Sequence, residues 1–147
     1  MALQLNVLLV EDNDWDAKLT KTRLEKVKRV NEVMWVKDGE EALASLFGED
    51  GQNEPQSDAI PHLILLDLKM PKIDGKEVLK EVRSRKSGKS IPIVVLSSSS
   101  RDEDIAECYE LGANSYIVKP TGFDLYNETI DSITNYWLNI NQVPSAV

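Results

Sequence analysis

The sequence predicts an α/β protein in which helices cover both faces of one parallel β-sheet of five strands. Short apolar runs alternate with longer amphipathic segments along the whole chain. The runs read VLLV, LILL and IVVL, which is typical of strands buried on both faces. No repeat or change of composition divides the 147 residues. We therefore expect a single domain over residues 1–147, with a core at about 5–139 and a short tail at 140–147.

The individual elements follow from these patterns and from the residues that cap them. Strands are expected at 6–10, 32–36, 63–66, 91–96 and 115–118. Helices are expected at about 14–30, 40–47, 75–85, 102–111 and 123–138. Asp14 and Asp38 are candidate N-caps, and Gly112 is expected to end the fourth helix. The segment 48–61 is polar and rich in turn formers, so we expect it to be the longest and most mobile loop.

Composition excludes several classes of protein. The net charge is −8, which argues against a nucleic-acid partner, because phosphate backbones are bound by clustered Lys and Arg. The single cysteine, Cys108, cannot form an internal disulfide and is expected to be a small buried side chain. The single histidine, His62, excludes zinc sites built from several histidines and is expected at the surface. No apolar run approaches the roughly 20 residues that span a bilayer, and the N-terminus does not resemble a signal peptide, so a cytoplasmic location is expected.

Chemically reactive side chains follow four of the five expected strands. Glu11 and Asp12 come after the first strand, Asp67 after the third, Ser97 after the fourth and Lys119 after the fifth. The carboxyl ends of parallel strands meet at one edge of a sheet, where binding sites gather. An acidic residue at a strand end is often only a solvated loop residue or a helix cap. The simultaneous placement of a hydroxyl and an ammonium group at two further strand ends favours a functional site.

Three carboxylates at one edge predict a site for a cation. Two ionised carboxylates about 4 Å apart repel by about 1 kcal/mol in water and about 4 kcal/mol at an effective dielectric constant near 20. Oxygen ligands without histidine or cysteine favour Mg²⁺, or Mn²⁺, over zinc or copper. Because Mg²⁺ commonly combines one or two carboxylates with phosphate oxygens, the pattern indicates a phosphoryl group beside a divalent metal.

Four stretches carry a resemblance to a known family. They are VLLVED at 7–12, LILLDLKMPKIDG at 63–75, IPIVVLSSS at 91–99 and GANSYIVKP at 112–120. Together they resemble the receiver domain of two-component response regulators, in the order that the family has them. The YWL ending of the last helix and the long acidic loop before the third strand are similar to the small phytochrome-associated (Rcp-type) response regulators. The resemblance implies a flavodoxin-like, doubly wound sheet of order 2-1-3-4-5 with five helices.

The resemblance also implies a role for each acidic residue. Asp67 would be the phosphoacceptor, which takes a phosphoryl group from the phosphohistidine of a sensor histidine kinase. Glu11, Asp12 and Asp67 would hold Mg²⁺ together with the backbone carbonyl of Lys69.

Further roles are implied for the last two strand ends. Lys119 and Ser97 would contact phosphoryl oxygens, and Ser97 and Tyr116 would form a switch that reports phosphorylation. The peptide bond between Lys119 and Pro120 would be cis.

This interpretation makes the protein a phosphoacceptor in a phosphorelay and not an enzyme, although it would assist its own phosphotransfer and dephosphorylation. Too few residues follow position 138 for an output domain, so we expect a stand-alone regulator that signals to protein partners or relays phosphoryl groups to a phosphotransfer protein. A bacterial phytochrome is a candidate kinase. The basic side chains of the first helix are either a kinase-docking surface or a solvated face. They are Lys18, Lys21, Arg23, Lys26, Lys28 and Arg29.

The last helix allows two interpretations. Tyr126, Ile130, Ile133 and Trp137 recur at helical spacing, which predicts a stripe facing the core. Its aromatic end at residues 136–138 could equally form a homodimer or partner interface, because Trp and Tyr are enriched at interfaces.

Three other functions are alternatives to that of a phosphoacceptor. A haloacid-dehalogenase-like phosphatase needs an acid two residues after its nucleophile, where this chain has Lys69. A flavodoxin-type carrier needs a phosphate loop after the first strand, where residues 11–14 read EDND and would repel phosphate. A phosphorylation-independent interaction module with the receiver fold stays open as the alternative.

Overall fold

The computed structural model describes residues 4–51, 60–70 and 72–144. Five parallel strands form one sheet in the order β2-β1-β3-β4-β5, which confirms the predicted fold class and strand order. The strands are β1 (Leu5–Val10), β2 (Val30–Val36), β3 (Leu63–Leu66), β4 (Ile93–Ser97) and β5 (Ser115–Val118). The helices are α1 (Asp14–Glu25), α2 (Gly39–Phe47), α3 (Gly75–Ser84), α4 (Asp102–Glu110) and α5 (Phe123–Thr134), with a short 3₁₀ turn at Lys86–Gly88 and a π-helical turn at Asn135–Ile140.

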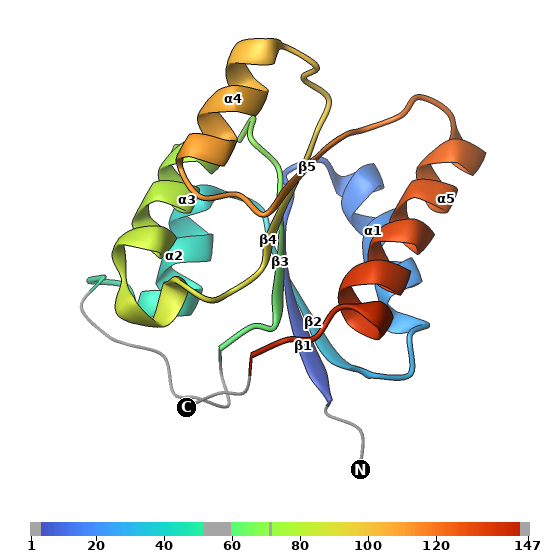
Figure 1. Cartoon of the computed structure of the whole chain (residues 1–147), viewed down its shortest axis with the longest axis horizontal. Coiled ribbons are helices and arrows are strands. Elements are labelled where there is room, and N and C mark those ends of the chain that lie inside the picture. Colours follow the sequence, from blue (N-terminus) through green and yellow to red (C-terminus); the bar gives the residue numbers. More distant parts are fainter. Residues whose placement is uncertain (1–3, 52–59, 71, 145–147) are drawn as a thin grey trace.

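The sheet separates the molecule into two layers of helices. Helices α1 and α5 cover one face, and α2, α3 and α4 cover the other (Figure 1). Successive residues of β3 alternate between the two layers, as the pleat of a strand requires. Ile64 and Leu66 belong to the core beneath α2–α4, whereas Leu63 and Leu65 belong to the core beneath α1 and α5. Burial on both faces is the physical reason that β3 is apolar throughout.

The structure confirms the predicted cap of α2 and corrects the predicted cap of α1. Asp38 caps α2 as expected, and its side chain accepts a hydrogen bond from the Glu41 amide at 2.8 Å. The predicted cap of α1, Asp14, is wrong by one residue, because Asn13 is the cap and accepts from the Asp16 amide at 2.9 Å. Asn13 has the extended backbone that a cap requires, whereas Asp14 is already helical.

Helix α1 ends at Glu25, earlier than the expected residue 30. The chain turns there, with the Val27 amide bonded to the Leu24 carbonyl and the Val30 amide to the Val27 carbonyl. β2 consequently starts at Val30 instead of 32. Pairing with β1 therefore overrides the helical pattern of these residues.

The basic residues of the first helical segment divide into two groups. Lys18, Lys26 and Lys28 are exposed. Arg23 instead pairs with Asp131 on α5, and Arg29 donates to a backbone carbonyl near the C-terminus. Only part of this basic set is therefore a solvated face.

The last helix continues past the expected end by changing its geometry. After Thr134 the hydrogen-bonding pattern widens into a π-helical turn. Leu138 in this turn is fully buried, and its carbonyl accepts from the Arg29 guanidinium at 2.9 Å. Tyr136 is 47% exposed, and Trp137 is half-buried with its ring against that of Tyr136.

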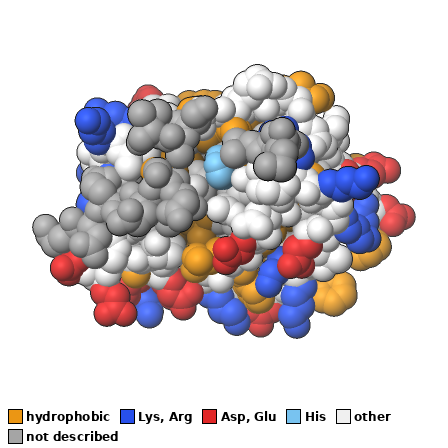
Figure 2. Space-filling model, turned by 90° about the horizontal axis from the view of Figure 1, so that it is seen from below, with side chains coloured by type: hydrophobic (Ala, Val, Ile, Leu, Met, Phe, Trp, Pro, Cys, Tyr) orange, Lys and Arg blue, Asp and Glu red, His pale blue; other side chains and the backbone are white. Residues whose placement is uncertain are grey.

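The opposite end of the sheet contains His62, which was expected at the surface. Its side chain is half-buried there, and its Nδ1 accepts a hydrogen bond from the Asn6 amide at 3.0 Å. Burial lowers the pKa of His62. Cys108 is buried as expected. Seen from this end, acidic and basic side chains are mixed around the rim (Figure 2).

The mobility expected for the loop at 48–61 falls largely on residues 52–59, which lie outside the described residues. Within the described part of the chain, no helix is both long and apolar enough to cross a membrane.

Candidate functional site

The site begins with three carboxylates at the carboxyl edge of the sheet. Glu11, Asp12 and Asp67 each place one oxygen within 4.8 Å of the others. The strands position them, because the Glu11 amide bonds to the Val36 carbonyl and the Asp67 amide to the Val10 carbonyl. Glu11 is 2% exposed and Asp67 is 7% exposed, whereas Asp12 faces solvent. The structure therefore brings together the acidic residues that the sequence singled out.

Lys119 places a positive charge among these carboxylates. Its Nζ lies 2.6 Å from Glu11 Oε1, 3.0 Å from Asp16 Oδ2 and 3.7 Å from Asp67 Oδ2. The Lys119 amide also donates to the Ser97 carbonyl at 2.7 Å, which fixes the chain where it leaves β5. A single ammonium group thus faces several carboxylates.

The electrostatic consequence is clearest at Glu11. Burial, and then the negative charge of Asp67, raise the pKa of Glu11 to about 8, although Lys119 opposes this shift. Burial disfavours the charged form of Lys119, but the hydrogen bond and charge of Glu11 outweigh it and raise the pKa of Lys119. The site therefore retains an excess of negative charge that a cation or a proton would relieve.

The donor set fits a hard divalent cation. Glu11, Asp12 and Asp67 offer only carboxylate oxygens, which Mg²⁺ and Mn²⁺ prefer. The exposed position of Asp12 leaves room for the water ligands that Mg²⁺ usually keeps. The backbone carbonyl of Lys69 stays a predicted fourth ligand.

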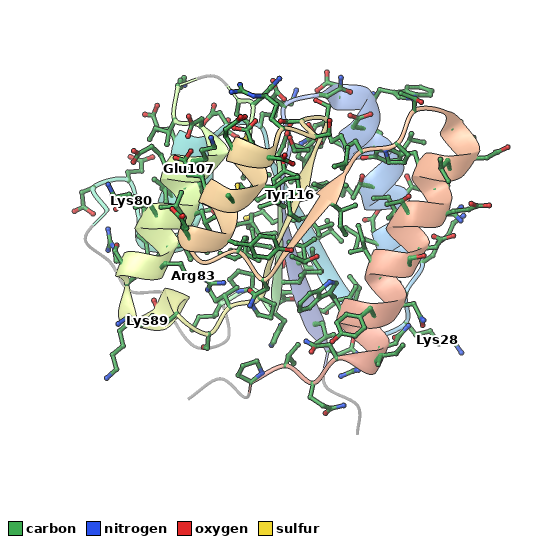
Figure 3. The ribbon with its side chains drawn as sticks, turned by 45° about the horizontal axis from the view of Figure 1, so that its top comes forward. Lys28, Lys80, Arg83, Lys89, Glu107 and Tyr116 are labelled. Carbon is green, nitrogen blue, oxygen red and sulfur yellow. The ribbon has the colours of Figure 1, made fainter. Side chains whose placement is uncertain are left out.

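The predicted switch residues are connected through Ser99. Ser97 is fully buried at the end of β4, and its Oγ accepts from the Ser99 amide at 3.1 Å. The Tyr116 hydroxyl donates to the Ser99 carbonyl at 2.8 Å. Figure 3 shows Tyr116 near the centre of the molecule, whereas Lys28 and Lys89 lie at the periphery.

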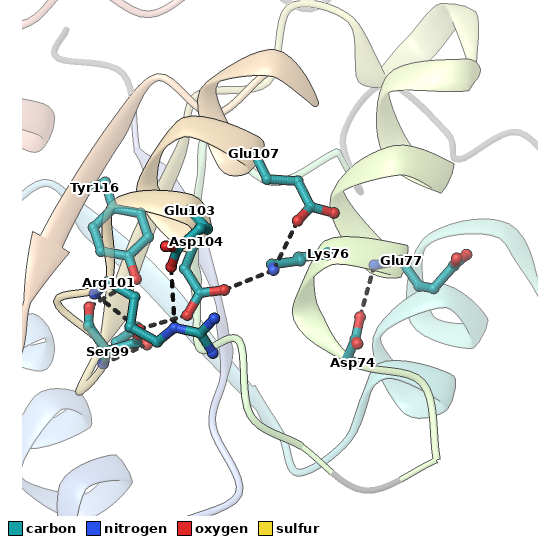
Figure 4. Close-up of polar contacts among 10 residues, drawn as sticks. Asp74, Lys76, Glu77, Ser99, Arg101, Glu103, Asp104, Glu107 and Tyr116 are labelled. Atoms are coloured by element: carbon teal, nitrogen blue, oxygen red, sulfur yellow. Dashed lines mark hydrogen bonds and ion pairs between the residues drawn. The ribbon is translucent and has the colours of Figure 1, made fainter.

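Ser99 extends the contacts to helices α3 and α4. Its hydroxyl donates to Asp104, which also accepts from Lys76 at 2.7 Å. Lys76 in turn reaches Glu107 at 2.9 Å, so one ammonium group of α3 holds two carboxylates of α4 (Figure 4). The hydrogen bonds from Lys76 and Ser99 lower the pKa of Asp104 to about 2. We call Lys76, Ser99, Asp104 and Glu107 the α3–α4 network.

Sequence reasoning missed three contacts in this region. Asp16 lies in the acidic first turn of α1, shortly after Asp12 in the sequence, and this position could have indicated it. Trp35 donates its indole N–H to the Glu11 carbonyl at 2.9 Å and so holds the backbone between the first two acidic residues. No sequence pattern signalled Trp35 or Ser99.

One site prediction is wrong. The Lys119–Pro120 peptide bond is trans, since the described chain contains no cis peptide. For a bond before proline, trans is the more stable form by about 0.5–1 kcal/mol. In this trans form Lys119 already reaches both the Ser97 carbonyl and Glu11, so its contacts do not require cis.

This geometry, with the fold that carries it, defines a receiver domain, and comparison with known proteins agrees. The family model for the response regulator receiver domain matches residues 7–131. The chain belongs to this family.

The relatives indicate one type within the family. Response regulator Rcp1 of Synechocystis sp. is 36% identical over 140 residues, which cover 95% of this chain and 93% of Rcp1. The probable methanogenesis regulatory protein FilR2 of Methanothrix harundinacea is 36% identical, over 94% of this chain and 86% of FilR2. The crystal structure of the phosphorylated cyanobacterial phytochrome response regulator RcpA superposes with a TM-score of 0.87 at 39% identity, over 97% of this chain and 99% of RcpA. The Mn²⁺-bound form of Rcp1 superposes with a TM-score of 0.85 at 34% identity, over 95% and 99% of the two chains. This chain is therefore a response regulator of the Rcp1 type.

Proposed function

We propose that Asp67 accepts a phosphoryl group from the phosphohistidine of a sensor histidine kinase. In this transfer the P–N bond to the imidazole breaks, a P–O bond to Asp67 forms, and the leaving imidazole takes up a proton. The observation that carries the proposal is the position of Asp67, which belongs to the carboxylate cluster and lies 3.7 Å from the Lys119 ammonium. Phosphoryl transfer depends mostly on positioning and on neutralising charge, and this site provides both.

The residues around Asp67 would have two roles, which are to bind a metal ion and to contact the phosphoryl group. Glu11, Asp12, Asp67 and the carbonyl of Lys69 would hold Mg²⁺, with Mn²⁺ as a substitute. When bound, the ion offsets the charge of the carboxylates and of the phosphoryl oxygens. Lys119 lies close enough to donate to a phosphoryl oxygen.

Ser97 and Tyr116 would turn this modification into a conformational signal. A phosphoryl group on Asp67 gives the Ser97 hydroxyl a new, strongly charged acceptor. Ser97 Oγ now accepts from the Ser99 amide, and Tyr116 bonds the Ser99 carbonyl, so a movement of Ser97 alters both contacts. We propose that partners recognise the resulting surface.

The protein would thus act as a signalling phosphoacceptor and not as an enzyme on an external substrate. The similarity to RcpA supports a bacterial phytochrome as its kinase. A phosphotransfer or downstream protein would receive the signal. The exposed Tyr136 and Ile140 support the further proposal of a homodimer through the C-terminal helix.

Acetyl phosphate with Mg²⁺ tests the proposal directly. Intact mass spectrometry should show one phosphoryl group on the wild type and none on Asp67→Asn. Asp74→Asn is a matched control, because asparagine can replace the aspartate that caps α3. If the wild type stays unmodified while Asp74→Asn and wild type both remain folded, the phosphorylation-independent interaction module becomes the better account.

A further inference from the structure

Lys119 has a second carboxylate partner that the proposed transfer does not use. Asp16 lies in the first turn of α1, and its Oδ2 is 3.0 Å from Lys119 Nζ. Asp67, the proposed phosphoacceptor, is 3.7 Å from the same nitrogen, which is beyond hydrogen-bonding distance. Without a phosphoryl group, the ammonium therefore bonds to Asp16 and Glu11 and not to Asp67.

The position of Asp16 is fixed by the start of its helix. The Asp16 amide donates to the side chain of Asn13, the cap of α1, at 2.9 Å. The Asp16 side chain is 25% exposed and that of Lys119 is 10% exposed, so their ion pair is only partly screened by water. The Lys119–Asp16 contact is consequently a built feature of the site and not a chance pairing of mobile surface groups.

Asp16 differs from Glu11 in one respect. Glu11 belongs to the carboxylate cluster that would bind a metal, whereas Asp16 lies outside that cluster. A divalent cation would neutralise Glu11 and weaken its attraction for Lys119. Asp16 would keep its full charge and remain the competing partner of the ammonium.

We propose that Asp16 competes with the phosphoryl group for Lys119 and thereby sets how tightly the site holds that group. This inference rests on the proposed function. An ammonium group shares its positive charge among its acceptors, so each carboxylate that it retains weakens its bond to a phosphoryl oxygen. Asp16 is thus a positioning residue that acts through Lys119.

Beryllium fluoride, a mimic of a phosphoryl group on aspartate, provides the test at saturating Mg²⁺. The binding is followed by the ¹H–¹⁵N signal of the Trp35 indole, which bonds the Glu11 carbonyl and so reports on the site. Asp16→Asn keeps the shape and removes the charge, and we expect it to bind the mimic about five- to tenfold more tightly. Asp14→Asn removes the same charge two residues away, where Asp14 pairs with Lys37, and should leave the affinity unchanged.

A double-mutant cycle separates competition from a general field effect. In a Lys119→Ala background, Asp16→Asn should no longer change the affinity, because the shared partner is gone. Equal tightening in both backgrounds would show that Asp16 acts directly on the anion and would overturn the inference. An unchanged or weaker affinity of Asp16→Asn, with the wild type binding normally, would also overturn it. If the wild type itself fails to bind beryllium fluoride, the proposed function fails instead.

Discussion

Glu11→Gln should change the pH dependence of stability in the metal-free protein. A carboxyl whose pKa rises on folding holds its proton more tightly in the folded state, so folding becomes less favourable as pH rises. For Glu11 this decline begins near its ordinary pKa of 4.5 and ends near about 8. The wild type should therefore lose stability through this interval, and Glu11→Gln should not show this part of the loss.

The magnitude follows from the size of the shift. Each pH unit between the two pKa values is worth about 1.4 kcal/mol, so Glu11 accounts for about 3 kcal/mol of lost stability between pH 5 and pH 8. Glu11 is 2% exposed, so solvent screening reduces this figure little.

Urea unfolding in EDTA at pH 5, 6, 7 and 8 measures this difference. The free energy of unfolding of Glu11→Gln should fall by about 3 kcal/mol less than that of the wild type over the series. Glu25→Gln, at an exposed position of α1, is the control and should follow the wild type. Saturating Mg²⁺ should reduce the wild-type decline, because the ion binds ionised carboxylates. Parallel curves of unfolding free energy against pH for wild type and Glu11→Gln would refute the conclusion that burial and the charge of Asp67 raise the pKa of Glu11.

Three further predictions concern other parts of the molecule. Mg²⁺ at about 100 times its Kd should stabilise the wild type by about 2.7 kcal/mol, and differential scanning calorimetry should find little of this shift in Asp12→Ala. Lys76→Ala should remove both ion pairs between α3 and α4 and speed hydrogen exchange of the α4 amides, whereas faster exchange in α1 would contradict this local role. Leu138→Ala should destabilise the protein by about 2–5 kcal/mol in urea unfolding, whereas Tyr136→Ala should change stability little and reduce the mass seen by light scattering if the dimer forms.

The sequence predicted the parts of the fold that depend on local periodicity. The strands at 63–66 and 115–118 were placed correctly, because polar residues directly flank each of these runs. The carboxylate cluster was predicted as well, since the rule that strand ends converge needs no knowledge of side-chain contacts.

The errors lie where tertiary contacts decide the outcome. Helix α1 stops early because residue 30 pairs with β1, and a helical pattern contains no information about that neighbour. The π-helical turn at Asn135–Ile140 seats Leu138 in the core, which a regular helical wheel does not anticipate. The contacts of Trp35 and Ser99 join segments that are distant in sequence or irregular in shape, so no fixed spacing reveals them.

Because the sheet divides the apolar interior, the two cores can accept substitutions independently of one another during evolution. Substitutions beneath α1 and α5 repack against one set of neighbours, and those beneath α2, α3 and α4 against another. The helices on one side of the sheet, and their binding partners, could therefore change while the helical layer on the other side keeps its structure. The carboxylate cluster follows β1 and β3, which both layers pack against, so it would keep its place while either side changed.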